Sequence, residues 1–153
     1  MNKSIACGEY HSVALRDDGT IECWGDNMFN QCDTIYKSFT NVIMVACGTN
    51  HSVALLSNGT IKFWGNNYLY QCDLVYKTFL CVIDIACGNN HSVALKSDGT
   101  LECWGANYFN QCDLVYKSFT NIIKIACGRH YSVALRNDGT IECWGIIQIM
   151  NVI

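Results

Sequence analysis

The strongest constraint on the fold is a repeat of 40 residues that runs through the chain four times without an insertion or deletion. The motif "ACG" begins at Ala6, Ala46, Ala86 and Ala126. The motifs "SVAL", "GT" and "WG" follow it at fixed distances in every copy. A strict period of this length is typical of proteins in which each structural unit buries its apolar face against the next unit.

Each period predicts short β-strands and no helix. In the second copy, residues 41–48 are apolar and β-branched, residues 51–56 alternate, and residues 61–65 return after an Asn-Gly turn. Asn-Gly readily adopts the positive φ that a tight hairpin requires. A short fourth strand is predicted near Cys72–Tyr76.

The alternation within a copy indicates how neighbouring units pack. His51, Val53 and Leu55 share one face of their strand, while Ser52 and Ala54 share the other. Bulky residues on one face and small ones on the other suit sheets that pack face to face. We therefore predict an all-β fold of β-propeller-type blades, each of three to four antiparallel strands, in four repeats. The alternative is a sandwich of unrelated hairpins, against which the strict period argues.

The repeated motif also resembles that of a known family. The pattern A-C-G-x-x-H-S-x-A-L, followed by D-G-T, W-G-x-N and a Gln, is similar to the regulator of chromosome condensation repeat. The resemblance covers residues 5 to 145 and implies a propeller of about seven blades, built here from the short 40-residue variant. Where the family usually has Gly before this Gln, the chain has Asn30, Tyr70 and Asn110. Asn tolerates a left-handed backbone, but Tyr does not do so readily.

The recurring Cys and His residues favour architecture over chemistry. An active site needs one asymmetric constellation, whereas these residues recur, and we expect the His that opens each strand to bond neighbouring backbone. The fourth copy has Tyr131 at this position, and Phe63 replaces a "CWG" cysteine in the second copy, which fits packing rather than metal ligation. We predict no catalytic residue, no metal site and no cofactor. One geometry remains open: the four "ACG" thiols, Cys7, Cys47, Cys87 and Cys127, converging on a metal at the axis of a closed ring.

Composition excludes several classes of partner. The formal net charge is −3, which gives no overall attraction to nucleic acid or to an anionic membrane. No apolar run is long enough for a signal peptide or a membrane span, so we expect an intracellular protein, cytoplasmic or nuclear, with reduced cysteines. The abundance of Asn, Ile and Lys suggests an AT-rich genome, such as that of a large DNA virus or its host.

If the residues that recur in every copy serve the fold, the residues that bind a partner are expected at the positions where the copies differ. The strand directions place the variable pair after each "ACG" and the segment after each "WG" on one rim, where aromatic residues, Asn and Arg are typical of protein interfaces. We expect Phe29, Leu69 and Phe109 on this rim to turn inward as core. The candidate protein-binding residues are Tyr10, Asn50, Tyr68, Tyr70, Asn90, Tyr108, Arg129 and His130.

The domain organisation raises the question of ring closure. Repeats occupy residues 1–145, with copies starting near 5, 45, 85 and 125, and residues 146–153 form a short apolar tail. Three outcomes are open: a ring completed by a homodimer, a small closed ring of four blades, or a remnant with exposed ends. The last three residues of the tail, "NVI", are identical in sequence to Asn41–Ile43, so we expect the tail to act as a ring-closing strand.

We predict from these features a non-enzymatic protein–protein interaction module that binds a partner through the variable loops of one propeller rim. The alternative is a guanine-nucleotide exchange factor or chromatin-associated regulator, as in the family's founding member. A third reading is an inhibitory role, such as occluding an enzyme. That founding member uses a blade insertion and a basic tail, and neither stands out in four copies of equal length.

Overall fold

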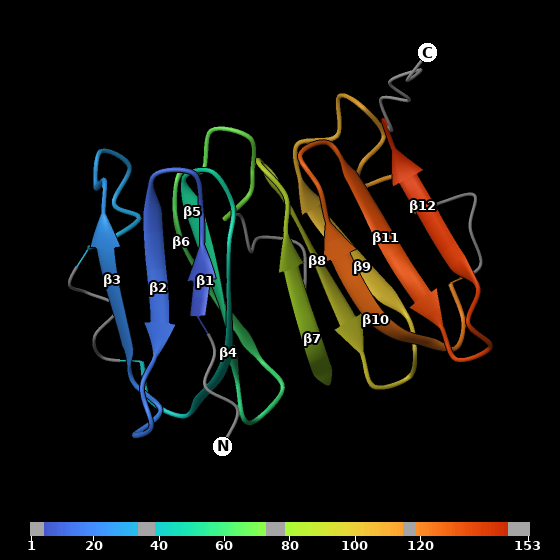
Figure 1. Ribbon diagram of the computed structural model, residues 1–153, viewed down its shortest axis with the longest axis horizontal. Coiled ribbons are helices and arrows are strands. Elements are labelled where there is room, and N and C mark those ends of the chain that lie inside the picture. The colour runs from blue at the N-terminus through green and yellow to red at the C-terminus, as the bar shows by residue number, and fades with distance from the viewer. Residues whose placement is uncertain (1–4, 34–38, 73–78, 115–118, 147–153) are drawn as a thin grey trace, which may run out of the picture.

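The computed structural model describes residues 5–33, 39–72, 79–114 and 119–146, and these form four separate antiparallel sheets of three strands each (Figure 1). We call them blades 1 to 4 in chain order. Their strands are β1 (Ile5–Cys7), β2 (His11–Leu15) and β3 (Ile21–Gly25); β4 (Val42–Cys47), β5 (His51–Leu56) and β6 (Ile61–Gly65); β7 (Val82–Cys87), β8 (His91–Lys96) and β9 (Leu101–Gly105); β10 (Ile122–Cys127), β11 (Tyr131–Arg136) and β12 (Ile141–Gly145). The predicted all-β fold is confirmed.

Turn chemistry sets the register of each blade. In blade 2, Leu55 pairs with Ile61 across the hairpin, and Gly59 takes a φ of 78° in the turn between them. The first strand of blades 2, 3 and 4 carries a β-bulge, which in blade 2 lies between Val42 and Met44. The bulge residue Ile43 is left exposed, although the strand around it is apolar.

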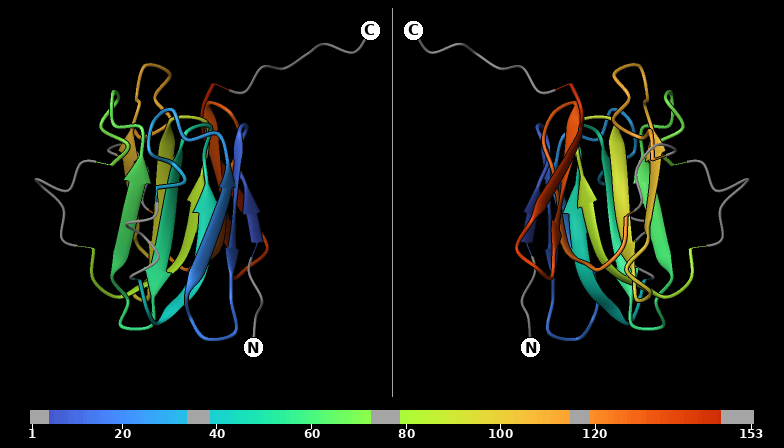
Figure 2. Two further views of the ribbon diagram at one scale, coloured as in Figure 1. Left: turned by 90° about the vertical axis from the view of Figure 1, so that its left-hand side faces the viewer. Right: turned by 90° about the vertical axis from the view of Figure 1, so that its right-hand side faces the viewer.

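The blades stand side by side as an arc. Figure 1 shows blade 1 and blade 4 at opposite ends, and in the end-on views of Figure 2 both curve toward the same side. The first strands of successive blades, β1, β4, β7 and β10, contact one another and line the inner side of this arc. The described residues therefore form part of a propeller ring.

Three apolar cores lie between the blades, and each contains a Val from one blade with an Ala and a Trp from the next. Val13 of blade 1 packs in one cluster with Ala54 and Trp64 of blade 2. Val53 meets Ala94 and Trp104 in the next cluster, and Val93 meets Ala134 and Trp144 in the third. The bulky face of one blade thus packs on the small face of the next, as the alternation predicted.

Two hydrogen bonds also recur between the blades. The Nε2 atoms of His11, His51 and His91 lie 2.6, 2.8 and 2.9 Å from the Oγ atoms of Ser52, Ser92 and Ser132 in the following blade. The indole Nε1 of each buried Trp donates to the backbone oxygen of a Gln in the preceding blade, as Trp64 does to Gln31 over 2.9 Å. Sequence alone indicated a backbone partner for the imidazole, whereas the structure gives it a serine one period further along.

Burial keeps these imidazoles neutral. His51 and His91 have no exposed surface, and this lowers the pKa of His51 to about 3 and that of His91 to about 4. Burial also lowers the pKa of His11. Each of these His residues therefore connects neighbouring blades through a buried hydrogen bond to a serine.

Some predicted features differ or fall outside the described residues. Blade 1 keeps a first strand of three residues, although its sequence lacks the apolar opening found in the other copies. The fourth strand near Cys72–Tyr76 lies beyond the described residues except for Cys72, and so does the tail after Ile146. Within the described part of the chain, no helix has the length and apolar character needed to cross a membrane.

Candidate functional site: an aromatic rim

Two sets of loops meet on one edge of the arc, the upper edge in Figure 1, and together form what we call the aromatic rim. These are the turns after the first strands and the segments after "WG". They are joined by backbone hydrogen bonds in all four blades: Asp26 N to Tyr10 O, Asn66 N to Asn50 O and Ala106 N to Asn90 O, each 2.8 Å, and Ile146 N to His130 O, 3.1 Å. The structure thus brings the predicted candidates to one rim.

The segments after "WG" are held in place by hydrogen bonds to side chains of the same segment. The side chain of a buried Gln, Gln71 in blade 2, accepts a hydrogen bond from the backbone N–H of Leu69 at 2.7 Å. Asn67 accepts another from the N–H of Cys72 at 2.8 Å. The equivalent bonds are present in blades 1 and 3. Such loops present their side chains in a fixed arrangement, which lowers the entropy lost on binding.

Tyr70 has a strained backbone. It takes a φ of 60°, as do Asn30 (61°) and Asn110 (58°) at the equivalent positions. This left-handed region costs a residue with a Cβ atom about 1–2 kcal/mol, and Asn tolerates it better than Tyr. Tyr70 does not recover this cost by burial, because its ring is largely exposed.

The candidates differ in how much of each side chain is available. Tyr68, Tyr70 and Tyr108 are between 68% and 79% exposed, and Tyr10 and Arg129 are exposed as well. The other three are half-buried. Asn50 lies 3.4 Å from the amide of Gln31, and the ring of His130 packs at 4.7 Å on Phe109, so both help to hold the rim together. Asn90 is placed mainly by its backbone carbonyl.

A hollow of about 390 Å³ opens between the rim loops of blades 1 and 2. Its walls include Met28, Phe29 and Tyr68, and the rings of Phe29 and Tyr68 meet edge to face at 6.2 Å. Phe29 and Leu69 are half-buried and Phe109 is exposed, so the prediction that these three residues belong to the core is wrong for Phe109. Met28, which sequence reasoning did not single out, is 78% exposed and lines the hollow together with Tyr68.

The four "ACG" cysteines line a second hollow, a groove of about 510 Å³ along the inner side of the arc. Its other walls are the glycines that follow them and Glu9, Thr49, Asn89 and Arg129. Burial raises the pKa of Cys47 and Cys127 to about 12 and that of Cys87 well above 9.0. In the described residues, no three His, Cys, Asp or Glu side chains come together so as to hold a metal ion. The raised pKa values keep the thiols of Cys47, Cys87 and Cys127 protonated at neutral pH.

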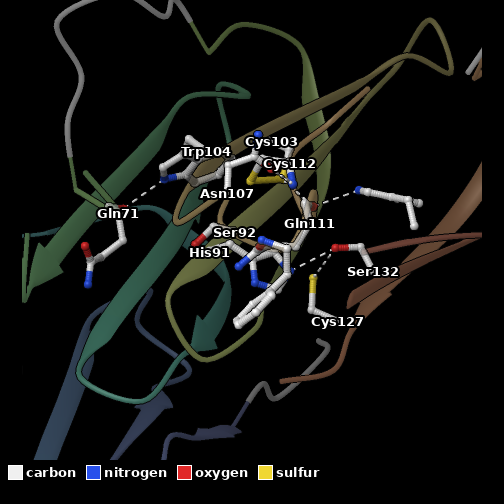
Figure 3. Close-up of a disulfide and its surroundings, with 12 residues drawn as sticks. Gln71, His91, Ser92, Cys103, Trp104, Asn107, Gln111, Cys112, Cys127 and Ser132 are labelled. Carbon is white, nitrogen blue, oxygen red and sulfur yellow. Dashed lines mark hydrogen bonds between the residues drawn. A yellow bond between two sulfur atoms is a disulfide. The ribbon is translucent and has the colours of Figure 1, made fainter. Parts of the chain in front are cut away.

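A disulfide joins Cys103 of β9 to Cys112 at the end of the rim loop in blade 3 (Figure 3). It lies beside Gln111 and Trp104, so it attaches the loop that carries Tyr108 to the blade. The prediction that the "CWG" cysteines serve packing alone is therefore wrong for Cys103, and the expectation of reduced cysteines is wrong for Cys103 and Cys112. A signal was present: copies 1 and 3 have both cysteines nine residues apart, while the second copy has Phe63 in the first position.

The edge of the arc opposite the aromatic rim carries the hairpin turns, and we call it the hairpin rim. Several of its described charged side chains form pairs. Within their own blades, Arg16 lies 2.9 Å from Glu22, Arg136 lies 3.1 Å from Glu142, and Lys96 pairs with Glu102. In the turns, Asp98 accepts hydrogen bonds from the backbone and hydroxyl of Thr100, which lowers its pKa. Among the described residues, the cations next to the hairpin turns of blades 1, 3 and 4 are therefore paired within their own blades.

A family model and solved structures agree with this architecture. The model of the regulator of chromosome condensation (RCC1) repeat matches residues 3–31, 42–71, 82–111 and 122–146. No curated protein matches the chain in a sequence comparison.

Among solved structures, human WBSCR16 is 24% identical with a TM-score of 0.78, over 92% of this chain and 46% of that protein. Yeast RCC1 (Prp20) bound to Kap60 is 23% identical with a TM-score of 0.73, over 92% and 43%. A structure of Prp20p from Saccharomyces cerevisiae, described with its binding to Gsp1p and histones, is 23% identical with a TM-score of 0.72, over 92% and 44%. These likenesses show the fold, and the chain spans less than half of each of these proteins. With four matched repeats over most of its length, the chain belongs to the regulator of chromosome condensation repeat family.

Proposed function

We propose that this chain is a non-enzymatic interaction module that binds a partner protein through the aromatic rim. The observation that carries the proposal is the exposure of Tyr68, Tyr70 and Tyr108 on loops fixed by buried glutamines. Tyrosine supplies a large contact area with few rotatable bonds and a polar tip, and it is enriched in residues that dominate binding energy.

The strain at Tyr70 supports a role in recognition. A backbone outlier at an exposed residue with no compensating burial is typical of functional positions. Replacing Tyr70 by the Asn found in the other copies would relieve the strain, so the tyrosine ring contributes something that folding does not require.

The hollow beside Met28 and Tyr68 gives the rim a place for an inserted group. The hollow is large enough to accept an apolar side chain of a partner, and the flexible side chain of Met28 can adapt to different shapes. Arg129, exposed at the blade 4 end of the rim, adds a cation that favours an acidic residue on the partner.

The relatives support a protein as the partner. Yeast RCC1 has been solved with Kap60 bound, and Prp20p is described as binding Gsp1p and histones. Nucleotide exchange remains an alternative function for this chain, and a nucleotide-release assay on small GTPases distinguishes it from binding alone. We also propose that nucleic acid is not a ligand, since the formal net charge is −3 and the described cations Arg16, Lys96 and Arg136 are paired. We propose in addition that a second copy of the chain extends the arc toward a ring.

The test is quantitative capture of proteins from cells that express the chain, with wild type and two variants as bait. In the rim variant, Tyr68→Ala and Tyr108→Ala are combined. The matched control is Ile83→Ala, which removes an exposed apolar side chain at the β-bulge of β7, away from the rim. A specific partner should be retained by wild type and the control and lost from the rim variant. The proposal fails if every protein captured by wild type is captured equally by the rim variant.

A further inference from the structure

The outer faces of blades 1 and 4 are the two halves of the interface that joins the blades inside the chain. On the outer face of blade 1, Ile5 is 68% exposed, whereas its counterparts Val45 and Ile85 are 5% and 6% exposed. Trp24 on the same face is 47% exposed, against 2% for Trp64. We call this surface the head face.

The outer face of blade 4 shows the complementary residues. Ile141 is 64% exposed, whereas Ile21, Ile61 and Leu101 at the same position are 4%, 5% and 8% exposed. Val133 is half-buried, although its counterparts Val13, Val53 and Val93 have no exposed surface. We call this surface the tail face. The head face presents the small-residue and Trp side of a blade, and the tail face presents the bulky side.

We infer that a second copy of this chain docks head to tail, so that its head face packs on the tail face through the interface already formed three times within the chain. This inference deepens the proposed self-association and is independent of the rim. The repeat is strict, so the tail face has the shape that each internal Ala and Trp face already fits. Such a contact is heterologous, because it joins two different surfaces, the head face of one copy and the tail face of the other. When two copies make this contact reciprocally, they form a closed ring of eight blades, which is within the range known for propellers.

Tyr131 provides the polar contact of the junction. Its ring covers Gly128 as the ring of His91 covers Gly88: a Cβ built on either glycine would lie 2.2 Å from Tyr131 Cζ or 2.1 Å from His91 Cε1. His91 reaches Ser132 of the next blade from this place. By the same geometry the Tyr131 hydroxyl donates to Ser12 of the second copy, the counterpart of the serines that accept a histidine contact between the described blades.

The experiment measures mass in solution by light scattering and sedimentation over 5–200 μM, at neutral pH. The chain has a mass of 17.1 kDa, and a closed pair is expected at about twice that value. Ile5→Asp blocks the head face and Ile141→Asp blocks the tail face, each at a side chain that is mostly exposed in the single chain. The matched control is Ile123→Asp, at an isoleucine that is 54% exposed on the β-bulge of β10.

Each blocked variant should be a monomer by itself, and the control should pair like wild type. An equimolar mixture of the two blocked variants should form pairs again, because one intact head meets one intact tail. Tyr131→Phe should weaken the pairing about 25-fold, because one hydrogen bond, worth about fivefold, is lost at each of the two junctions of the closed ring.

A monomeric wild type at 200 μM overturns the inference, as does pairing that survives Ile141→Asp or fails to return in the mixture. Partner capture by the rim, repeated with monomeric Ile141→Asp, separates the two proposals. Retained capture leaves the rim function intact even where the head-to-tail contact fails.

Discussion

Acidification should destabilise the protein through its buried histidines. An unfolded imidazole has a pKa near 6.5, whereas His51 and His91 have pKa values of about 3 and about 4 in the folded chain. Below pH 6.5 the unfolded chain therefore takes up protons that the folded chain does not, and the free energy of unfolding falls as the pH falls toward the folded values. Above pH 6.5 both states are neutral and these groups contribute no pH dependence.

The loss of unfolding free energy is set by how far the pH lies below 6.5, the pKa of the unfolded imidazole. At pH 5.0 each imidazole is 1.5 pH units below its unfolded pKa, and each unit corresponds to about 1.36 kcal/mol, so each contributes about 2 kcal/mol. The two together lower the free energy of unfolding by about 4 kcal/mol, a large share of the 5–15 kcal/mol (roughly) that is typical of a domain. The lowered pKa of His11 adds to the loss in the same direction.

Urea denaturation at pH 7.5 and pH 5.0, followed by tryptophan fluorescence, measures this loss. His51→Gln keeps a donor for Ser92 but removes one titrating group, so its loss between the two pH values should be about 2 kcal/mol smaller. A wild type whose unfolding free energy changes by less than about 1 kcal/mol between the two pH values refutes the reasoning. So does a His51→Gln variant with the full loss of the wild type.

Three further predictions concern single positions. Tyr70→Asn should raise the free energy of unfolding by about 1 kcal/mol by relieving its left-handed φ, while Tyr108→Asn should not, and urea denaturation compares them. Reduction of the disulfide should cost about 2–3 kcal/mol for its short loop, and Cys112→Ser should make the melting temperature insensitive to reductant. Gly48→Ala should cost at least about 3 kcal/mol, because the new methyl would lie 2.1 Å from His51 Cε1. Gly139→Ala, with nothing within 4 Å, should cost only about 1 kcal/mol of backbone strain in the same assay.

The strands and their packing could be predicted because both are local consequences of the pattern. Alternation places Val53 and Ala54 on opposite faces, and a strict period means that each bulky face must meet the same small face. The hairpins followed from the Asn-Gly and Asp-Gly turns. The polar contacts between the blades were harder to predict from the sequence, because the partner of His51 is Ser92, 41 residues further along the chain.

The details of the site were harder to predict for physical reasons that differ between residues. Whether Cys103 and Cys112 pair depends on the distance between a strand and a loop, which spacing alone does not determine. The exposure of Phe109 depends on how the fourth blade covers it through His130. Tyr70 is the exception: its occurrence where the family usually has Gly already indicated an unfavourable backbone, and the structure confirms the positive φ.

The central claim is that recurring residues join the blades while the rim residues that vary provide recognition. Isothermal titration calorimetry at neutral pH, with an isolated partner and the combined Tyr68→Ala and Tyr108→Ala variant, tests it most directly. We expect the variant to bind with a dissociation constant at least about tenfold weaker than that of wild type, since two exposed aromatic anchors are lost. An unchanged dissociation constant would contradict it.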